Sequence, residues 1–385
     1  MKILYVAVDT RIPGSHGGSV HVQELCHALG QRGHDVHILA PKGVSGLPTN
    51  DRDGIIQDGS VRVHRLAKPT RYFEWTAVRH IRRLILELRP DVLVERFYTF
   101  GGAGILAANL EGIPAVLEVN SPARPVDRLW RDRLDRLTII RPIHRWRCRI
   151  LRGCNGIYAT SRYLLPPEMQ NTVTLVTNGV DVTRFKPGPV EREKGPLKCV
   201  YISSFKSWHG AEDLVRAVAL CRSRGVDICV TCIGSGPTWK SATRLAKRLG
   251  VGEDIKFLGA IPFDKVPKHL AEAEIGLAPF SPSKFSPLEL GWFWSPIKLF
   301  EYLAAGLGII TINLKELRDL LPDSVARFYK AGATEELSML LERFSSNPAE
   351  VVLLRQKARE LAESDYTWLH QAATVEQLLE RVQAK

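Results

Sequence analysis

The chain has 385 residues, of which 45% are hydrophobic and 24% are charged, and its formal net charge is +12 at pH 7. This composition excludes an intrinsically disordered chain, and the length suits two domains of ordinary size. The positive charge favours an anionic partner, but by itself it does not choose among nucleic acid, anionic lipid and a phosphorylated substrate.

Membrane-spanning, secreted and metal-binding classes find no support in the sequence. No stretch approaches the roughly 18 uncharged apolar residues of a membrane-spanning helix. The first apolar run ends at Asp9 and is too short for a secretory signal, so we expect a cytoplasmic protein. The Cys count is 7, an odd number that does not form a disulfide framework. Cys229 and Cys232 lie in an apolar run without a second ligand pair, so we expect a strand and no metal site.

Strand and helix patterns alternate along the first half of the chain. Short β-type runs predict strands at 3–8, 36–39, 92–94 and 115–119. Apolar residues at helical spacing predict helices at 20–29 and 73–88. Alternation of this kind is typical of a parallel sheet with helices on both faces.

The alternation stops at 183–197, which is rich in Pro, Gly and charge and is predicted to be a linker. Beyond it, strands are predicted at 199–202, 228–233, 255–258, 275–278 and 309–312, and helices at 211–222, 240–249, 296–305 and 367–382. We therefore predict an α/β protein of two doubly wound, Rossmann-like domains, with divisions 1–182, 183–366 and 367–385. Ligands of such sheets bind at the carboxyl ends of the strands, so the cleft between the domains is the expected site.

Two glycine-rich loops follow predicted strands, one in each domain. Gly17 and Gly18 precede the first helix, and Gly234 and Gly236 follow the strand at 228–233. Such loops let a ligand approach the backbone and leave helix N–H groups free for an anion. The alternative is a turn that needs positive φ, although two loops in matching positions are more informative than one.

The loop at 203–210 carries Ser204, Lys206, His209 and Gly210 between a strand and a helix. A Lys and a His beside a helix N-terminus would supply positive charge to a diphosphate. The alternative is a solvated Lys and a capped helix.

The segment 295–306 carries a second candidate anion site. Ser295 suits an N-cap and Pro296 the first helical position, which places Lys298 in the first turn. A cation is unfavourable there unless an anion binds nearby. Glu301 would accept hydrogen bonds from the vicinal hydroxyls of a ribose, or would be an exposed helix residue.

Taken in order, these motifs resemble those of glycosyltransferase family 4. The matching segments are Gly17-Gly18, Gly33-His34-Asp35-Val36, Asn178-Gly179-Val180-Asp181 with Phe185 and Pro187, the loop from Lys206 to Gly210, Gly234-Ser235-Gly236-Pro237, Phe257-Leu258-Gly259, and Glu301 with Ala304-Ala305-Gly306. The resemblance covers nearly the whole chain.

The resemblance implies a GT-B fold and transfer of a hexose-type sugar, with retention, from a UDP- or GDP-linked donor. It implies no metal or other cofactor, an acceptor-binding first domain, a donor-binding second domain, and a final helix that crosses back to the first domain. Glu301 would bind the ribose, and Lys206 and Lys298 would face the diphosphate. Further donor contacts would come from Gly17, Gly18, Ser204, His209, Gly210, Gly234, Gly236, Ser295 and Ile297.

Some positions depart from the family pattern. Phe293 stands where the family has the first of two Glu residues, and Glu289 is a possible substitute in the same loop. Ser204 and His209 replace the usual Arg and Lys, so Lys206 is the expected replacement charge.

Glu118 and Asn120 follow a strand and are the acceptor-side candidates, or else ordinary loop polarity. With Lys206, Lys298 and Glu301 they complete the predicted catalytic set. The segment 124–152 is rich in Arg and Trp, so it would dock on an anionic membrane or a lipid-linked acceptor, or be a solvated helix face.

The expected function is therefore glycosyl transfer to a glycan, glycolipid or lipid-linked acceptor in cell-surface polysaccharide biosynthesis, peripheral to the membrane. A nucleic-acid partner is not expected, because no recognition module is present. A nucleotide-sugar epimerase of the same fold and a non-catalytic nucleotide-sugar-binding subunit remain as alternatives.

Overall fold

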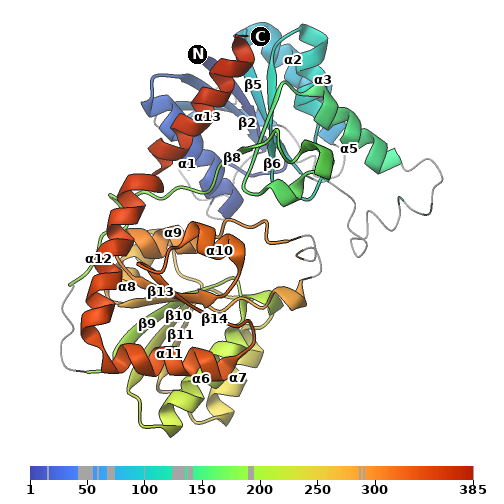
Figure 1. Ribbon diagram of the computed structural model, residues 1–385. Coiled ribbons are helices and arrows are strands. Elements are labelled where there is room, and N and C mark those ends of the chain that lie inside the picture. Colours follow the sequence, from blue (N-terminus) through green and yellow to red (C-terminus); the bar gives the residue numbers. More distant parts are fainter. Residues whose placement is uncertain are drawn as a thin grey trace. The chain divides into compact units, whose positions relative to one another are not determined.

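The computed structural model describes residues 1–14, 17–41, 55–58, 60–66, 74–98, 100–123, 135, 137, 142–189, 195–285, 288 and 291–384. The chain divides into two compact units (Figure 1). Unit 1 comprises Met1–Gly179, Phe293–Ser295 and Trp368–Lys385, and unit 2 comprises Val180–Trp292 and Pro296–Thr367. The chain therefore leaves unit 1 after Gly179, where we had placed the division after residue 182.

Unit 1 is built on an eight-stranded sheet in the order β3-β4-β2-β1-β5-β6-β7-β8, in which only β3 runs antiparallel to its neighbour. Its strands are β1 (Lys2–Val6), β2 (Asp35–Pro41), β3 (Ile55–Asp58), β4 (Val61–Leu66), β5 (Val92–Phe97), β6 (Ala115–Val119), β7 (Gly156–Ala159) and β8 (Thr174–Leu175). Its α-helices are α1 (Gly17–Gln31), α2 (Val78–Leu88), α3 (Ala103–Glu111), α5 (Pro142–Gly153) and α13 (Trp368–Gln383), and its short 3-10 turns are η1 (Glu74–Ala77), η2 (Arg162–Leu164) and η3 (Pro167–Met169).

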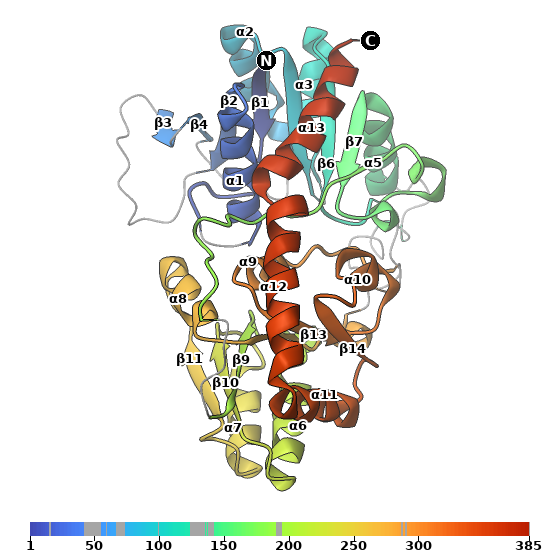
Figure 2. The same ribbon diagram turned by 60° about the vertical axis from the view of Figure 1, so that its left-hand side comes forward.

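The last helix of the chain belongs to the core of unit 1. α13 packs against α1, and its apolar face, which includes Val375 and Leu379, joins β1 and β2 in one buried cluster (Figure 2). Burial of this apolar stripe explains why a helix from the end of the sequence is held on a sheet formed mainly from its start.

Unit 2 is built on a six-stranded, all-parallel sheet in the order β11-β10-β9-β12-β13-β14. Its strands are β9 (Leu197–Ile202), β10 (Ile228–Ile233), β11 (Ile255–Gly259), β12 (Ile275–Ala278), β13 (Gly308–Ile312) and β14 (Ala326–Tyr329). Its helices are α6 (Ala211–Ser223), α7 (Trp239–Arg248), α8 (Val266–Ala271), α9 (Ile297–Ala304), α10 (Lys315–Leu320), α11 (Thr334–Ser346) and α12 (Pro348–Asp365), with 3-10 turns η4 (Ser207–His209), η5 (Phe263–Lys265) and η6 (Pro282–Lys284). The predicted fold class, two parallel-sheet α/β domains, is confirmed.

Residues 182–189, which include the first part of the segment predicted to be a linker, are tied to α12. Arg359 donates through Nη1 to the Phe185 carbonyl oxygen at 2.7 Å and through Nη2 to that of Val182 at 3.0 Å. The buried Arg355 donates to the Pro189 carbonyl oxygen at 2.6 Å. Arginine side chains thus supply the hydrogen bonds that this irregular backbone does not make to a sheet.

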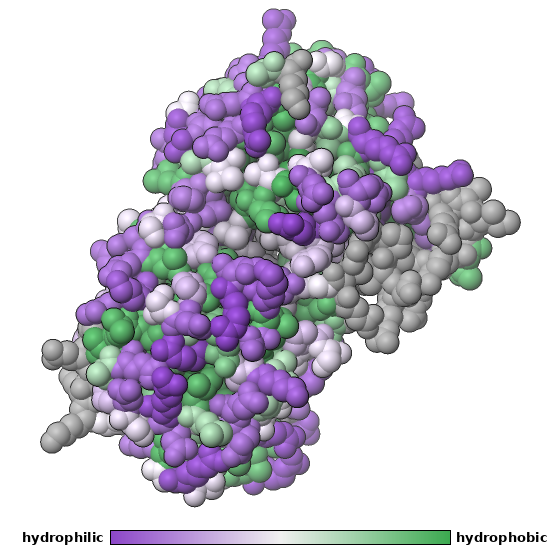
Figure 3. Space-filling view, viewed as in Figure 1, coloured by the Kyte–Doolittle hydropathy of each residue, from purple (hydrophilic) through white to green (hydrophobic). Residues whose placement is uncertain are grey.

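In the part of the chain that the structure describes, no helix is both long and apolar enough to cross a bilayer. Hydrophilic residues cover most of the face shown in Figure 3, and hydrophobic residues appear there in small groups.

Candidate functional site

In unit 2 the loops that follow β9 and β10 lie directly against each other. A Cβ at Gly234 would sit 1.9 Å from the Ser203 carbonyl oxygen, and one at Gly236 would sit 1.9 Å from that of Ser204. Gly234 also has φ +111°, a conformation that favours glycine. Both glycines are therefore required for packing between the loops.

His209 is neutral in this loop pair, so the expectation that it supplies positive charge is wrong. Its Nδ1 lies 2.9 Å from the Ser203 hydroxyl oxygen. Burial, together with the nearby charges of Lys298 and Lys206, lowers the pKa of His209 to about 3. Lys206 itself is exposed, with its ammonium 5.1 Å from the centre of the Trp208 ring, so the ammonium is accessible to a ligand.

The other loop positions are placed as follows. Gly210 has φ +74° where α6 begins, and a Cβ there would lie 1.4 Å from the Pro279 carbonyl oxygen. Ser204 is exposed. Gly210 is thus explained by the close approach of the segment after β12, while Ser204 is open to solvent.

Lys298 and Glu301 lie on adjacent turns of α9. The Lys298 ammonium donates to the Ile202 carbonyl oxygen at 3.0 Å, at the end of β9, and lies over the Tyr201 and Phe280 rings. Burial lowers the pKa of Lys298 to about 7, an effect that the Glu301 charge partly opposes. The lysine is therefore held at the carboxyl end of the sheet with an incompletely stabilised charge.

Glu301 is buried, with 6% of its surface exposed, so it is not the exposed helix residue of the alternative interpretation. Burial raises its pKa to about 7, while Lys298 and Arg184 lower it. Ile297, partly exposed, begins α9.

The prediction that Ser295 caps α9 is wrong. The N-cap of α9 is Pro296, without a side-chain hydrogen bond, and the helix starts at Ile297. The Ser295 hydroxyl instead accepts a hydrogen bond of 2.9 Å from the Asn178 backbone N–H, inside unit 1. The Ser295 side chain thus makes a tertiary hydrogen bond and is not the helix cap that the local sequence predicts.

Phe293 also lies in unit 1. It is 5% exposed, and its carbonyl oxygen accepts a 2.9 Å hydrogen bond from the Thr160 hydroxyl. A buried aromatic ring therefore occupies the position where the family pattern has its first Glu. Glu289 lies outside the described residues.

Unit 1 gathers polar side chains at the carboxyl ends of β1, β5 and β6, around Glu118. One oxygen of this 2% exposed carboxylate accepts from Arg96 at 2.8 Å and Asn120 at 2.6 Å, with the His21 Nε2 at 3.0 Å. The other accepts from Tyr158 at 2.7 Å and from Tyr5.

These contacts determine what Glu118 can do. Burial favours its neutral form, but the charges of His21 and Arg96 and the hydrogen bond from Tyr158 hold the pKa of Glu118 well below its usual range. A saturated, ionised carboxylate orients its neighbours and has no free oxygen for a ligand. Asn120 is partly exposed at the same edge.

The Asn178-Gly179 pair is explained by contacts inside unit 1. The Asn178 Oδ1 lies 2.7 Å from the His21 Nδ1, and its amide nitrogen donates to the Ser295 carbonyl oxygen. A Cβ at Gly179 would lie 2.8 Å from the Trp368 Cα. Asn178 thus fixes His21, which in turn contacts Glu118.

Comparison with known proteins places these sites in a family. The model of Glycosyltransferase Family 4 matches residues 15–184, and that of Glycosyl transferases group 1 matches residues 196–347. The chain belongs to this pair of GT-B glycosyltransferase families.

Curated relatives include GDP-mannose-dependent alpha-(1-6)-phosphatidylinositol monomannoside mannosyltransferases. The one from Mycolicibacterium smegmatis is 31% identical over 109 residues, which are 26% of this chain and 28% of the relative. The one from Mycobacterium tuberculosis is 26% identical over 302 residues, 72% of each chain. The match with this glycosyltransferase thus covers little more than a quarter of the length of the first relative.

Solved structures with the same fold include sucrose-phosphate synthase from Thermosynechococcus elongatus, with a TM-score of 0.72 at 15% identity over 100% of this chain and 99% of that one. HepE from Anabaena in complex with UDP has a TM-score of 0.73 at 14% identity, over 99% and 100%. At these identities the likeness shows the fold.

Two site residues of this glycosyltransferase, Arg96 and His21, were not found from the sequence. The predicted strand stopped at residue 94, whereas β5 continues to Phe97 and carries Glu95 and Arg96 in its buried end. The signal available in the sequence was the charged pair Glu95 and Arg96 at the end of an apolar strand. Burial of charge is costly, and ligands bind at the carboxyl edge of a parallel sheet, so charged residues at such a strand end indicate a site.

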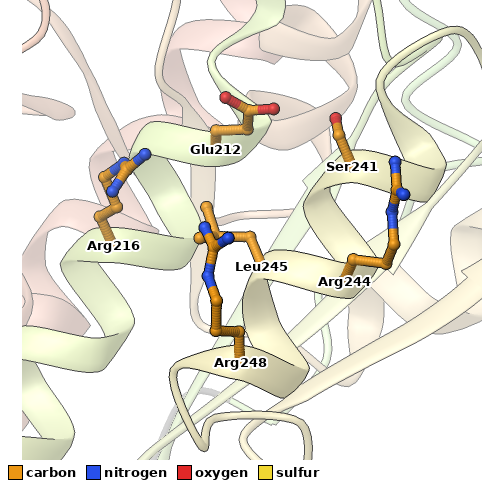
Figure 4. A pocket seen from close by; sticks show the side chains of 6 residues that line it. All are labelled: Glu212, Arg216, Ser241, Arg244, Leu245 and Arg248. Atoms are coloured by element: carbon orange, nitrogen blue, oxygen red, sulfur yellow. The ribbon is translucent and has the colours of Figure 1, made fainter.

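A hollow of about 360 Å³ lies elsewhere in unit 2, between α6 and α7 (Figure 4). It is lined by Glu212, Arg216, Ser241, Arg244, Leu245 and Arg248. Its arginine side chains are exposed, and the loops after β9 and β10 contribute nothing to it, so it is not the candidate site.

The described residues contain no group of three or more His, Cys, Asp or Glu residues placed to hold a metal ion. Cys229 and Cys232 are free thiols in β10. Of the segment 124–152, only residues 135, 137 and 142–152 are described, so the predicted membrane contact falls largely outside the described residues.

Proposed function

We propose that this glycosyltransferase transfers a hexose-type sugar, with retention at the anomeric carbon, from a UDP- or GDP-linked donor. The observation that carries the proposal is the placement of Lys298 and Glu301 on α9, with the Lys298 ammonium at the end of β9. A diphosphate requires positive charge and a ribose requires a hydrogen-bond acceptor, and unit 2 offers both from one short helix.

The transfer breaks the bond between the anomeric carbon and the diphosphate oxygen. The acceptor hydroxyl oxygen bonds to the same face of that carbon, and its proton passes to the leaving phosphate. Lys298 and the exposed Lys206 stabilise the charge that develops on the diphosphate, which makes the reaction metal-independent in this proposal. A bound anion also favours the ammonium form of Lys298, whose pKa burial lowers to about 7.

The relatives support the donor and acceptor classes. Two mannosyltransferases are named as GDP-mannose-dependent with a phosphatidylinositol monomannoside acceptor, and structures of HepE contain UDP and UDP-glucose. A further relative is named for colanic acid biosynthesis. We therefore propose that unit 1 binds a glycan, glycolipid or lipid-linked acceptor for cell-surface polysaccharide synthesis at the cytoplasmic face of a membrane. Asn120 faces that acceptor, and Glu118 positions its neighbours.

The test is a thermal-shift panel of UDP, GDP, ADP and their sugar conjugates on wild type, Glu301→Ala and Glu253→Ala. Glu253 is an exposed Glu of the same unit and serves as the control. A saturating ligand of the folded state should raise the melting temperature by about 2–10 °C. We expect one nucleotide family to stabilise wild type and Glu253→Ala but not Glu301→Ala. A panel without any shift in wild type would contradict the proposal.

Phe293 supports one second candidate, a subunit that binds nucleotide sugar without transferring it, because a buried aromatic ring stands in place of the first Glu. Incubation of the purified protein with radiolabelled donor separates the two. Slow release of free sugar into water, above that of Glu301→Ala, would exclude the non-catalytic candidate.

A further inference from the structure

The hollow between α6 and α7 in unit 2 gathers positive charge (Figure 4). Its volume of about 360 Å³ lies within the usual range of small-molecule pockets, about 300–1,000 Å³. Arg216 lines it from α6, and Arg244 and Arg248 line it from α7. Among the described residues, Glu212 is the one carboxylate in its lining. Three guanidinium groups and one carboxylate therefore face the same hollow, which concentrates positive potential there.

The arginines of the hollow have no carboxylate partner among the described residues. Within this part of the chain, Arg216 and Arg248 make no hydrogen bond or ion pair, and Arg244 donates only through Nε, to a carbonyl oxygen of its own helix at 3.3 Å. Arg222, by contrast, also lies on α6 and donates to Asp254 at 2.7 Å. The arginines of the hollow thus keep their donors for a ligand.

Helix stability does not account for this gathering of charge. Arg244 and Arg248 stand four residues apart on α7, so their like charges repel each other. Arg248 lies in the last turn of α7, where the helix dipole favours a cation, but Arg244 does not. Glu212 stands four residues before Arg216 on α6, a spacing that favours an ion pair, yet the two form none in the described structure. An anion bound among the three guanidinium groups would offset the repulsion.

The lining has two chemically different ends, as Figure 4 shows. Glu212 and Ser241 lie together at one end, and Arg248 lies at the other. Arg216 and Arg244 flank the space between the two ends. A guanidinium group suits a phosphate, to which it donates two parallel hydrogen bonds. A carboxylate repels a phosphate but accepts hydrogen bonds from hydroxyl groups, and a serine hydroxyl both donates and accepts. The hollow therefore matches a molecule with a phosphate at one side and hydroxyl groups at the other.

We propose that this hollow is a binding site for a phosphate ester that carries hydroxyl groups. The phosphate lies among the arginines, and Glu212 and Ser241 bind the hydroxyl groups. The ester is either a soluble molecule or the headgroup of a lipid, since both present the same chemistry. The site lies within unit 2 and shares no residue with the donor groups Lys298 and Glu301, so it does not rest on the transfer reaction proposed above.

Exposed residues of α6 and α7 provide variants that should fold as wild type does. Arg216→Gln and Arg244→Gln each remove one guanidinium group from the hollow and leave a polar side chain. Lys247→Gln is the matched control, because it removes an exposed charge from α7 outside the lining. Equal melting temperatures of all four proteins confirm that the variants are folded.

The soluble source is tested by isothermal titration of the full chain with glycerol 3-phosphate. The lipid source is tested by sedimentation with phosphatidylglycerol vesicles, beside phosphatidylcholine vesicles as the neutral baseline. We expect Arg216→Gln and Arg244→Gln each to weaken the binding of at least one probe by about tenfold, the effect of losing one charge-assisted hydrogen bond. At about 0.15 M salt, Lys247→Gln should stay within about twofold of wild type, because a charge outside the lining is screened.

The probe that is affected identifies the source of the phosphate. Weaker glycerol 3-phosphate binding shows that a soluble ester fits the hollow, and weaker vesicle binding alone assigns the site to a lipid headgroup. The proposal is overturned if wild type binds neither probe, or if both arginine variants bind the probes as Lys247→Gln does. Stabilisation by UDP or GDP that Glu301→Ala abolishes and Arg244→Gln leaves intact would support the proposed function whichever way these titrations turn out.

Discussion

Substitution of Gly234 by Ala tests whether packing between the loops after β9 and β10 holds unit 2 together. The new methyl group would lie 1.9 Å from the Ser203 carbonyl oxygen, where ordinary contacts begin at 3.4 Å. One loop must therefore move by about 1.5 Å, since neither backbone can compress. This movement breaks the hydrogen bond from the Ser203 N–H to the Ile233 carbonyl oxygen, 2.9 Å, or that from the Gly234 N–H to Gly259, 2.7 Å.

The free energy of unfolding should fall by about 3 kcal/mol. A non-Gly residue at φ +111° costs ~1–2 kcal/mol, and the broken hydrogen bond adds ~1–2 kcal/mol. For a unit of this size the melting temperature should fall by about 6–12 °C. Nucleoside-diphosphate binding should weaken as well, because the same loops carry Ser204 and Lys206.

The assay is thermal and urea unfolding beside Gly252→Ala. Gly252 has no heavy atom within 4 Å of an added Cβ and no positive φ. Gly252→Ala therefore shows the effect that a Gly-to-Ala change has on the unfolded chain, without a clash in the folded state. The reasoning is refuted if the melting temperature of Gly234→Ala lies within 1–2 °C of that of Gly252→Ala, because the clash should lower it by about 6–12 °C.

Three further outcomes follow from the buried polar groups. Lys298→Met should raise stability yet weaken nucleoside-diphosphate binding about tenfold. The pKa of Lys298 is about 7 in the folded protein and 10.5 in the unfolded chain, so the wild type should lose stability relative to the variant as the pH falls from 10.5 to 7, which urea unfolding measures. His209 has a pKa lowered to about 3, so wild type should lose stability relative to His209→Gln as pH falls below 6.5, and equal slopes would contradict a neutral buried imidazole. Asn178→Asp sets a carboxylate oxygen against the Ser295 carbonyl and should cost ~2–3 kcal/mol, whereas Ser295→Ala, which removes one acceptor, should cost less; calorimetric melting of both variants measures the order.

The sheets were predictable because buried parallel strands are short apolar runs. The strands at 115–119, 228–233 and 275–278 agree with β6, β10 and β12 at both ends. β14 was not predicted, and it carries Arg327, which pairs with Glu350 at 2.9 Å on α12. An edge strand half open to solvent lacks the continuous apolar run that marks a central one.

Residue type and spacing were enough to place Lys298 and Glu301 on one helix, α9. They were not enough for Ser295, whose hydroxyl binds Asn178, which lies 117 positions earlier, instead of capping α9. Nor were they enough for His209, since a histidine loses its charge only when its surroundings exclude water.

The sequence by itself determined the alternation of strands and helices, the glycine positions and the family, because these depend on local apolar period and on motifs of a few residues. Only the tertiary structure decided how those residues are used. It joined Arg96, Glu118 and His21 at one sheet edge. The physical reason is that burial and partner geometry determine charge state and hydrogen bonding, and both come from residues far apart in the chain.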